Sequence, residues 1–186
     1  MRKLLMLVLC AWLALPAWAL NEGHGVEGPG WFKQSFLDIR EDVAEATRAR
    51  RKLMLYFYQD GCPYCARFLR ETLGVKTIED RTFRNFDVVA IDLRGAREVT
   101  DLAGKAQPEN QFAEAMGVKY TPTFLVFDEA GKVILRQSGF PPPRKFSAML
   151  DYVAEGAYRS YPDFDIYLKV RASAGMIRGE GGALMR

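Results

Sequence analysis

The chain has 186 residues, with 26 lysines and arginines against 23 aspartates and glutamates, which gives a formal net charge of +3. This length favours a single domain whose core is large enough to fold alone. The two signs of charge are nearly balanced and form no long block, which argues against a nucleic-acid-binding surface.

The first 19 residues have the pattern of a secretory signal peptide. Arg2 and Lys3 precede an apolar run that is too short for a trusted membrane span, and the run ends in Ala17-Trp18-Ala19, a small-x-small site. Cleavage after Ala19 would remove two cations and leave 167 of the 186 residues with a net charge of +1. We therefore expect the mature protein in the periplasm. An uncleaved membrane anchor is the alternative.

A helix and a strand are expected before the cysteines. Residues 20–30 are rich in glycine and are expected to form a flexible N-terminal segment. A leading amphipathic helix is predicted by apolar residues at intervals of four and three, namely Phe32, Phe36, Ile39, Val43 and Ala46. The run from Leu53 to Tyr58 is apolar and aromatic throughout, which predicts a strand buried on both faces.

The next stretch, Asp60 to Cys65, reads DGCPYC and contains the two cysteines that remain once Cys10 leaves with the signal peptide. A structural zinc site needs four ligands, and this pair with His24 supplies three at most. A structural disulfide across two residues closes too small a loop to stabilise the fold much. In an exported protein, the pair is best interpreted as a dithiol that cycles between thiol and disulfide.

The two sulfurs are expected to play different roles, because the pair opens a helix that Gly74 is placed to end. Cys62 lies at the first turn, where free N–H groups and the helix dipole favour a thiolate, and is the predicted nucleophile. Pro63 suits the same turn. Cys65 faces the apolar side and is the predicted resolving thiol. That side also holds Phe68, Leu69 and Thr72.

The remaining elements complete an α/β pattern. The predicted elements are a strand at Asp87–Leu93, a helix at Pro108–Met116, a hairpin of strands Thr123–Phe127 and Val133–Gln137 around Asp128-Glu129-Ala130-Gly131, and a helix at Phe146–Ala157. With a leading helix, the order β-α-β-α-β-β-α implies a central mixed sheet flanked by helices on both faces.

From residue 31 to about 158 the chain resembles the thioredoxin superfamily. The resemblance rests on Cys62-Pro63-Tyr64-Cys65 after a strand, Thr121-Pro122 before a strand, and Gly139 after the next strand. Within the superfamily the chain is similar to the periplasmic SoxW-type thioredoxins, judged by REVTDLAGK (Arg97 to Lys105) and TPTFLVFDEAGKV (Thr121 to Val133).

The resemblance implies a thioredoxin fold and a substrate surface around the dithiol. It implies a cis bond before Pro122 and pairing of the Thr121 backbone with an extended substrate segment. It also places Pro63, Tyr64 and Gly139 at the substrate-binding surface. An ordinary trans bond at Thr121-Pro122 is the alternative.

Two positions depart from cytoplasmic thioredoxins, which carry a buried Asp and a neighbouring Lys beneath the resolving thiol. Tyr56 and Ala90 occupy the matching positions here. The usual proton relay is therefore absent. Water, the Tyr56 hydroxyl and the Asp60 carboxylate are the candidate replacements.

We expect a monomeric thiol–disulfide oxidoreductase that works mainly as a reductase and needs neither metal nor cofactor. The evident insertion, Arg94 to Gln107, is too short for the helical domain of strongly oxidising relatives.

The resemblance implies a membrane thiol transporter of the DsbD or CcdA type as electron donor. It also implies cysteine-containing periplasmic proteins as substrates, such as sulfur-oxidation carriers or apocytochromes c. The alternatives are a disulfide oxidant or isomerase, or a non-catalytic module that binds unfolded or cysteine-containing partners through the Thr121-Pro122 groove. Phe140 and Pro141-Pro142-Pro143, beside that groove in the family's geometry, would suit such a module. The other interpretation of Phe140 is a packing residue that anchors the proline-rich loop.

Residues 159–186 are predicted to be a C-terminal extension that is partly disordered. Its aromatic part is expected to pack on the domain, and Gly179-Glu180-Gly181-Gly182 is expected to be disordered. The alternative for the apolar part is an amphipathic membrane contact. Its apolar residues are Tyr161, Phe164, Ile166, Tyr167 and Leu168.

Overall fold

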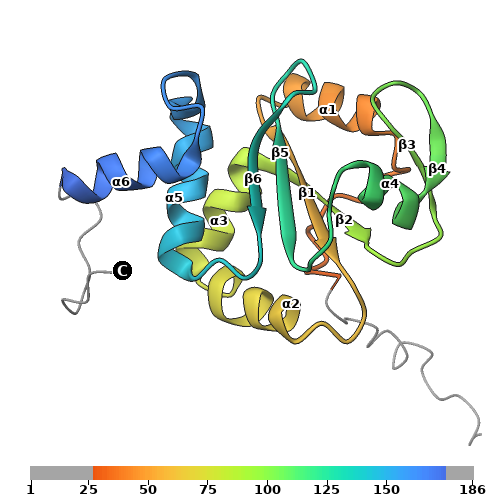
Figure 1. The fold of residues 1–186 in the computed structure, drawn as a ribbon, viewed down its shortest axis with the longest axis horizontal. Coiled ribbons are helices and arrows are strands. Elements are labelled where there is room, and N and C mark those ends of the chain that lie inside the picture. The colour runs from red at the N-terminus through yellow and green to blue at the C-terminus, as the bar shows by residue number, and fades with distance from the viewer. Residues whose placement is uncertain (1–26, 175–186) are drawn as a thin grey trace, which may run out of the picture.

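The computed structural model describes residues 27–174 (Figure 1). The predicted signal peptide, most of the predicted flexible segment and the glycine-rich tail lie outside the described residues. The elements in chain order are α1 (Ile39–Arg48), β1 (Lys52–Tyr58), α2 (Pro63–Arg67), the π-helical turn η1 (Phe68–Leu73), α3 (Lys76–Asn85), β2 (Phe86–Asp92), β3 (Glu98–Thr100), β4 (Ala106–Pro108), α4 (Glu109–Ala115), β5 (Thr123–Phe127), β6 (Val133–Ser138), α5 (Pro143–Ala154), the 3₁₀ turn η2 (Ala157–Arg159) and α6 (Phe164–Ser173).

The core of the fold is a four-stranded sheet in the order β2-β1-β5-β6. The β1–β2 pair is parallel, whereas β1–β5 and β5–β6 are antiparallel, so the sheet is mixed as predicted. α1 and α4 cover one face, and α2, η1, α3 and α5 cover the other (Figure 1). The Arg94 to Gln107 insertion contains a separate two-stranded sheet of β3 and β4.

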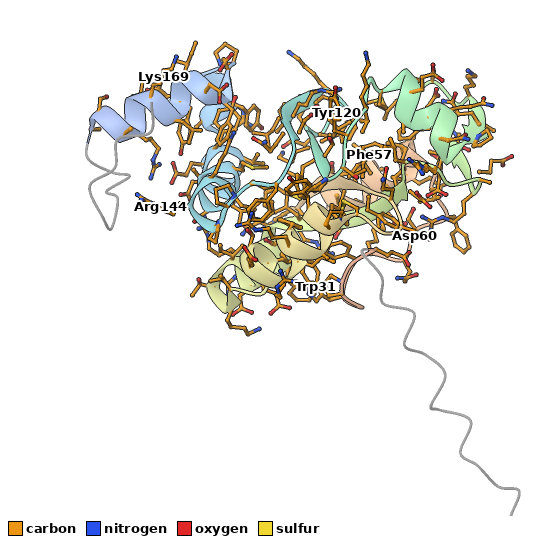
Figure 2. All side chains as sticks on the ribbon, turned by 60° about the horizontal axis from the view of Figure 1, so that its bottom comes forward. Trp31, Phe57, Asp60, Tyr120, Arg144 and Lys169 are labelled. Carbon is orange, nitrogen blue, oxygen red and sulfur yellow. A yellow bond between two sulfur atoms is a disulfide. The ribbon has the colours of Figure 1, made fainter. Side chains whose placement is uncertain are left out.

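β1 is the central strand that carries the cysteine pair at its carboxyl end. Side chains of a strand point alternately to opposite faces, so Met54, Tyr56 and Tyr58 enter the core beneath α2, whereas Leu55 and Phe57 enter the core beneath α1. Figure 2 shows Phe57 inside the molecule and Lys169 on the outside of α6. Burial on both faces explains why the strand is apolar without alternation.

The leading helix is shorter than the periodicity predicted. It begins at Ile39, because the Asp38 side chain accepts the N–H groups of Arg40 and Glu41 and caps it there. Phe36 is therefore fully exposed, and the prediction that it lies on an inward helical face is wrong.

Phe32 was also wrongly assigned to this helix, although its side chain is buried. It precedes the helix, and its ring packs 5.8 Å from that of Tyr56. The neighbouring Lys33 N–H donates to the Val88 carbonyl (2.8 Å), so this segment runs beside the outer edge of β2 instead of coiling.

The sequence analysis did not predict α3. This helix buries only Ile78 and Thr82 among its ten residues, so its apolar pattern is weak. It follows η1, which ends at Leu73 with Gly74 as the capping residue, as predicted.

The first part of the C-terminal extension packs on the domain, as expected. The Tyr152 ring of α5 lies 5.3 Å from that of Phe164 and 5.1 Å from that of Tyr167. Ile166 is half exposed and does not share this packing. Within residues 27–174, no helix has the length and apolar character needed to cross a bilayer.

Candidate active site

The cysteine pair lies at the start of α2, directly after the central strand, as predicted. Cys62 is the N-cap residue and Pro63 is the first residue of the helix. The two sulfurs form a disulfide, with 5.3 Å between the Cα atoms. The Cys62 Sγ also accepts the Cys65 N–H (3.1 Å), which is one of the free donors that a helix start offers.

Both cysteines are shielded, and the resolving position is the deeper one. Cys65 is 0% exposed and belongs to the core that includes Phe68 and Tyr56, whereas Cys62 is 3% exposed. The neighbouring Tyr64 is 57% exposed. The structure thus places Cys65 on the apolar face, as the helical spacing predicted, and leaves Tyr64 exposed.

The Thr121-Pro122 segment lies against the cysteine pair. The peptide bond before Pro122 is cis, as the resemblance implied. The Thr121 hydroxyl donates a hydrogen bond to the Cys62 Sγ (3.2 Å). The Pro122 carbonyl accepts the Gly139 N–H (2.8 Å), and Gly139 has a φ of 80°, a left-handed conformation that favours glycine. The structure therefore brings together three segments that are far apart in the sequence.

Tyr56 occupies the position beneath the pair that the resemblance assigned to a buried Asp. It is fully buried, and its register partner in β2 is Ala90, as aligned from the sequence. Its ring lies 5.8 Å from that of Phe68 and 5.5 Å from that of Phe124. Burial raises the pKa of the Tyr56 hydroxyl above its ordinary value, so this group keeps its proton at physiological pH and has no anionic oxygen to accept another.

Tyr58 is the second tyrosine on this face of β1, and its ring stacks on that of Tyr56 at 6.0 Å. Burial is the main cause that raises the pKa of its hydroxyl, and the charge of Glu27 adds to it. Arg97 acts in the opposite sense. Both hydroxyls beside the cysteine helix therefore remain protonated at physiological pH.

The sequence analysis missed an acidic residue that anchors the insertion. Glu109 is 1% exposed, and its Oε1 accepts the Asp92 N–H (2.9 Å) and the Arg97 guanidinium (2.6 Å). Its Oε2 accepts the Arg97 N–H (3.2 Å). This pairing fixes the start of the insertion to the end of β2. The only sequence signal was a glutamate after Pro108 at a helix start, which is ordinary.

The loop after β6 is also anchored. The Thr72 hydroxyl of η1 donates to the Pro141 carbonyl (2.9 Å), and both residues are buried. The Arg67 guanidinium of α2 lies 4.6 Å from the centre of the Phe140 ring. Phe140 is thus a partly buried residue that packs against the core and the Arg67 side chain.

A further aromatic residue at this surface was not singled out from the sequence. Tyr120 directly precedes Thr121 and is 70% exposed (Figure 2). Asp60, in the turn before Cys62, is exposed as well. Among residues 27–174, no group of three or more His, Cys, Asp or Glu side chains is arranged to hold a metal ion.

Comparison with known proteins agrees with this geometry. The family model of the thioredoxin-like domain matches residues 39–154. The chain belongs to this thioredoxin-like family. Comparison with curated proteins finds no significant match.

Solved structures share the fold. A thioredoxin-fold protein from Helicobacter pylori superposes with a TM-score of 0.57 at 23% identity, covering 73% of this chain and 92% of that one. A thioredoxin from Thermus thermophilus gives a TM-score of 0.50 at 25% identity, covering 63% and 84%. The predicted thioredoxin fold is confirmed, with a Cys62–Cys65 pair capable of forming a disulfide, which supports thiol–disulfide oxidoreductase chemistry.

Proposed function

We propose that the protein is an exported thiol–disulfide oxidoreductase that reduces disulfides of periplasmic partner proteins through Cys62 and Cys65. The observation that carries this proposal is the position of the Cys62 Sγ. It lies at a helix start and receives both the Cys65 N–H and the Thr121 O–H. Two donors aimed at one sulfur favour its thiolate form, which is the nucleophile in thiol–disulfide exchange.

The reaction needs two exchanges. In the reduced protein, the Cys62 thiolate attacks one sulfur of a substrate disulfide, forming a mixed disulfide and releasing the first substrate thiolate, which takes up a proton. Cys65 then loses its proton and attacks the Cys62 Sγ. The mixed disulfide breaks, the second substrate thiolate leaves and is protonated, and the Cys62–Cys65 disulfide forms. Two electrons have moved to the substrate.

The Cys65 proton must leave without a buried aspartate. The Tyr56 hydroxyl keeps its proton at physiological pH, because burial raises its pKa, so it offers no anionic oxygen to take up the Cys65 proton. We therefore assign the proton to water that reaches the mixed disulfide or to the exposed Asp60 carboxylate in the preceding turn.

The substrate segment would dock beside the cis-proline. The Thr121 backbone would pair with an extended stretch of the substrate, next to Pro63, Tyr64 and Gly139. The surface exposure of Tyr64 suits this contact.

Electrons would come from a membrane thiol transporter of the DsbD or CcdA type, and the protein would act as a monomer in the periplasm. The SoxW-type resemblance suggests sulfur-oxidation carriers or apocytochromes c as substrates. The short β3–β4 insertion supports a role as a reductase and not as a strong oxidant. Strongly oxidising relatives carry a helical domain, whereas this insertion forms a hairpin. Oxidation or isomerisation of disulfides is the second candidate, since the same thiol pair performs either when its potential is higher.

An insulin-reduction assay with dithiothreitol as electron source tests the proposal. We expect wild type to accelerate insulin precipitation and Cys62→Ser to fall to the uncatalysed rate, because it lacks the attacking sulfur. Thr77→Ser, a small change at an exposed position of α3, serves as the control and should match wild type. A wild type without activity above background would instead identify a binding module.

A further inference from the structure

The two edges of the four-stranded sheet differ in how they are covered. At the outer edge of β2, the carbonyls of Val88 and Ala90 accept hydrogen bonds from other segments, and the Asp92 N–H donates one. β6 is the opposite edge, and among residues 27–174 it pairs with β5 alone. An edge strand with free N–H and carbonyl groups is a template for pairing with another extended chain.

The ladder shows which backbone groups of β6 are free. The Gly139 N–H donates to the Pro122 carbonyl, and the backbone groups of an antiparallel strand point alternately toward its partner and away from it. Counting back from Gly139, Ser138 and Arg136 therefore turn their N–H groups away from β5. The outer edge of β6 offers these donors to an added strand.

A groove follows this edge, with β6 on one side and residues 162–165 of the C-terminal extension on the other. Its two parts have volumes of about 450 Å³ and about 500 Å³, and both are lined by Ile134 and Pro162. The Phe164 ring lies 5.3 Å from that of Tyr152 in α5, which holds the wall in place. The six residues of β6 span roughly 20 Å at about 3.3 Å each, so the groove accepts a strand of similar length.

The charges of the groove favour an acidic occupant. Lys145 of α5 lines the groove and is partly buried, and it forms no hydrogen bond or ion pair with any of residues 27–174. The nearby carboxylates are already offset. Asp163 and Asp165 lie at the start of α6, where the helix dipole favours negative charge, and Glu129 pairs with Lys52. A carboxylate on an added strand would give Lys145 the partner that it lacks.

We propose that the outer edge of β6 is a docking site for an extended acidic segment of a substrate protein, which adds a fifth strand to the sheet. This inference rests on the proposed function and names a class of partner for it. The groove ends at Ser138, and the next residue, Gly139, is bonded to Pro122 beside the cysteine pair. A segment held on β6 therefore leads toward Cys62, and it selects partners by a sequence outside the one that carries their disulfide.

The probe is a fluorescein-labelled peptide TVEVEVT, blocked at both ends and free of cysteine, and TVKVKVT is its basic counterpart. Fluorescence anisotropy with the oxidised protein measures the affinity. Lys145→Glu reverses the charge of the groove. Arg136→Pro removes an outward N–H at a position where an edge strand tolerates proline. Lys169→Glu, on the outside of α6, changes the net charge equally and is the control (Figure 2).

We expect wild type to bind the acidic peptide more tightly than the basic one. Lys145→Glu should weaken binding of the acidic peptide roughly tenfold, because an attractive pair becomes repulsive. The same variant should bind the basic peptide more tightly than wild type does. Arg136→Pro should bind both peptides at least about tenfold more weakly, because main-chain hydrogen bonds supply the affinity of an added strand. Lys169→Glu should match wild type.

Three results would overturn the proposal: a wild type that does not prefer the acidic peptide, an equal loss in Lys145→Glu and Lys169→Glu, or an Arg136→Pro variant that binds like wild type. If circular dichroism shows that Arg136→Pro does not fold, Ser138→Pro takes its place and the same loss is required.

Sedimentation of the protein alone tests whether a second copy occupies the edge. A dimer that the proline variant converts to a monomer would overturn the acidic segment as the occupant, and a wild-type monomer supports it. None of these readouts involves the cysteines. A failure of the reductase proposal would therefore appear in the insulin assay and leave the binding results intact.

Discussion

The contact between Gly95 and Glu109 allows a sharp test of how the insertion is fixed beside the active site. A β-carbon added at Gly95 would lie 2.0 Å from Glu109 Oε2 and 2.9 Å from Asp92 Cβ. No real structure tolerates such distances, so Gly95→Ala must displace the Glu109 carboxylate. That carboxylate is buried and accepts two bonds from Arg97 and one from the Asp92 N–H.

The cost follows from these bonds. A hydrogen bond to a charged group contributes about 1.5–3 kcal/mol, and breaking a buried ion pair costs about 3–5 kcal/mol. Arg97 is half exposed, so water replaces part of what its guanidinium loses. We therefore expect Gly95→Ala to lower the free energy of unfolding by about 2–3 kcal/mol, which is less than the cost of breaking a fully buried ion pair.

Urea unfolding of the oxidised protein, followed by circular dichroism, measures this change. With a slope of about 1–3 kcal/mol per molar urea, the midpoint should fall by roughly 1 M at unchanged slope. Gly30→Ala is the matched control, because its β-carbon would meet nothing within 4 Å, and it should change stability by less than about 0.5 kcal/mol.

A double variant separates the clash from other effects. In Gly95→Ala/Glu109→Ala the displaced carboxylate is absent, so the two losses should be clearly less than additive. Additive losses, or a Gly95→Ala variant as stable as the control, would refute the reasoning.

Three further predictions concern the cysteine pair. Alkylation of the reduced protein near neutral pH should label Cys62 well before Cys65, since the helix start lowers the pKa of Cys62 below the free-thiol value of about 8.5. Equal labelling rates would reverse or abolish the assigned roles. Cys65→Ser should accumulate a mixed disulfide with its substrate, detected on non-reducing gels, because the resolving attack is lost. Normal turnover by this variant would require a monothiol mechanism. Equilibration with glutathione should give a potential nearer the thioredoxin value of about −270 mV than the oxidising value of about −120 mV, because no cation lies between the cysteines. A result near −120 mV would make the protein a disulfide donor.

The local elements around the pair could be predicted because their signals are short-range. The apolar run of β1, the turn before Cys62 and the proline at the first helical position are all contiguous in the sequence, and the structure places them as expected. The cis-proline and Gly139 were located through resemblance to a family, since no local signal predicts a cis bond.

Periodicity failed where tertiary contacts competed with it. Phe32 and Phe36 fit a helical spacing, but the Asp38 cap starts the helix at Ile39, and the Lys33 N–H bonds to β2 instead. For α3 the error is the reverse, because a helix forms where the periodicity predicted none. Its pattern is mostly polar, and it forms a helix against the core with Ile78 as its main buried apolar residue. Propensity and periodicity are weak forces that packing overrides.

The sequence by itself determined the α/β class, the helix-opening cysteine pair and the buried tyrosine in place of an aspartate. The first two depend on patterns of residues along the chain, and the third depends on the resemblance to thioredoxins. Only the tertiary structure decided that Glu109 fixes the insertion through Arg97, and that the Thr121 hydroxyl reaches the Cys62 Sγ. These contacts join residues that are 12 and 59 positions apart in the sequence, and a local spacing pattern does not predict such contacts. They exist because closure of the sheet brings the end of β1, the start of β5 and the insertion to one end of the molecule.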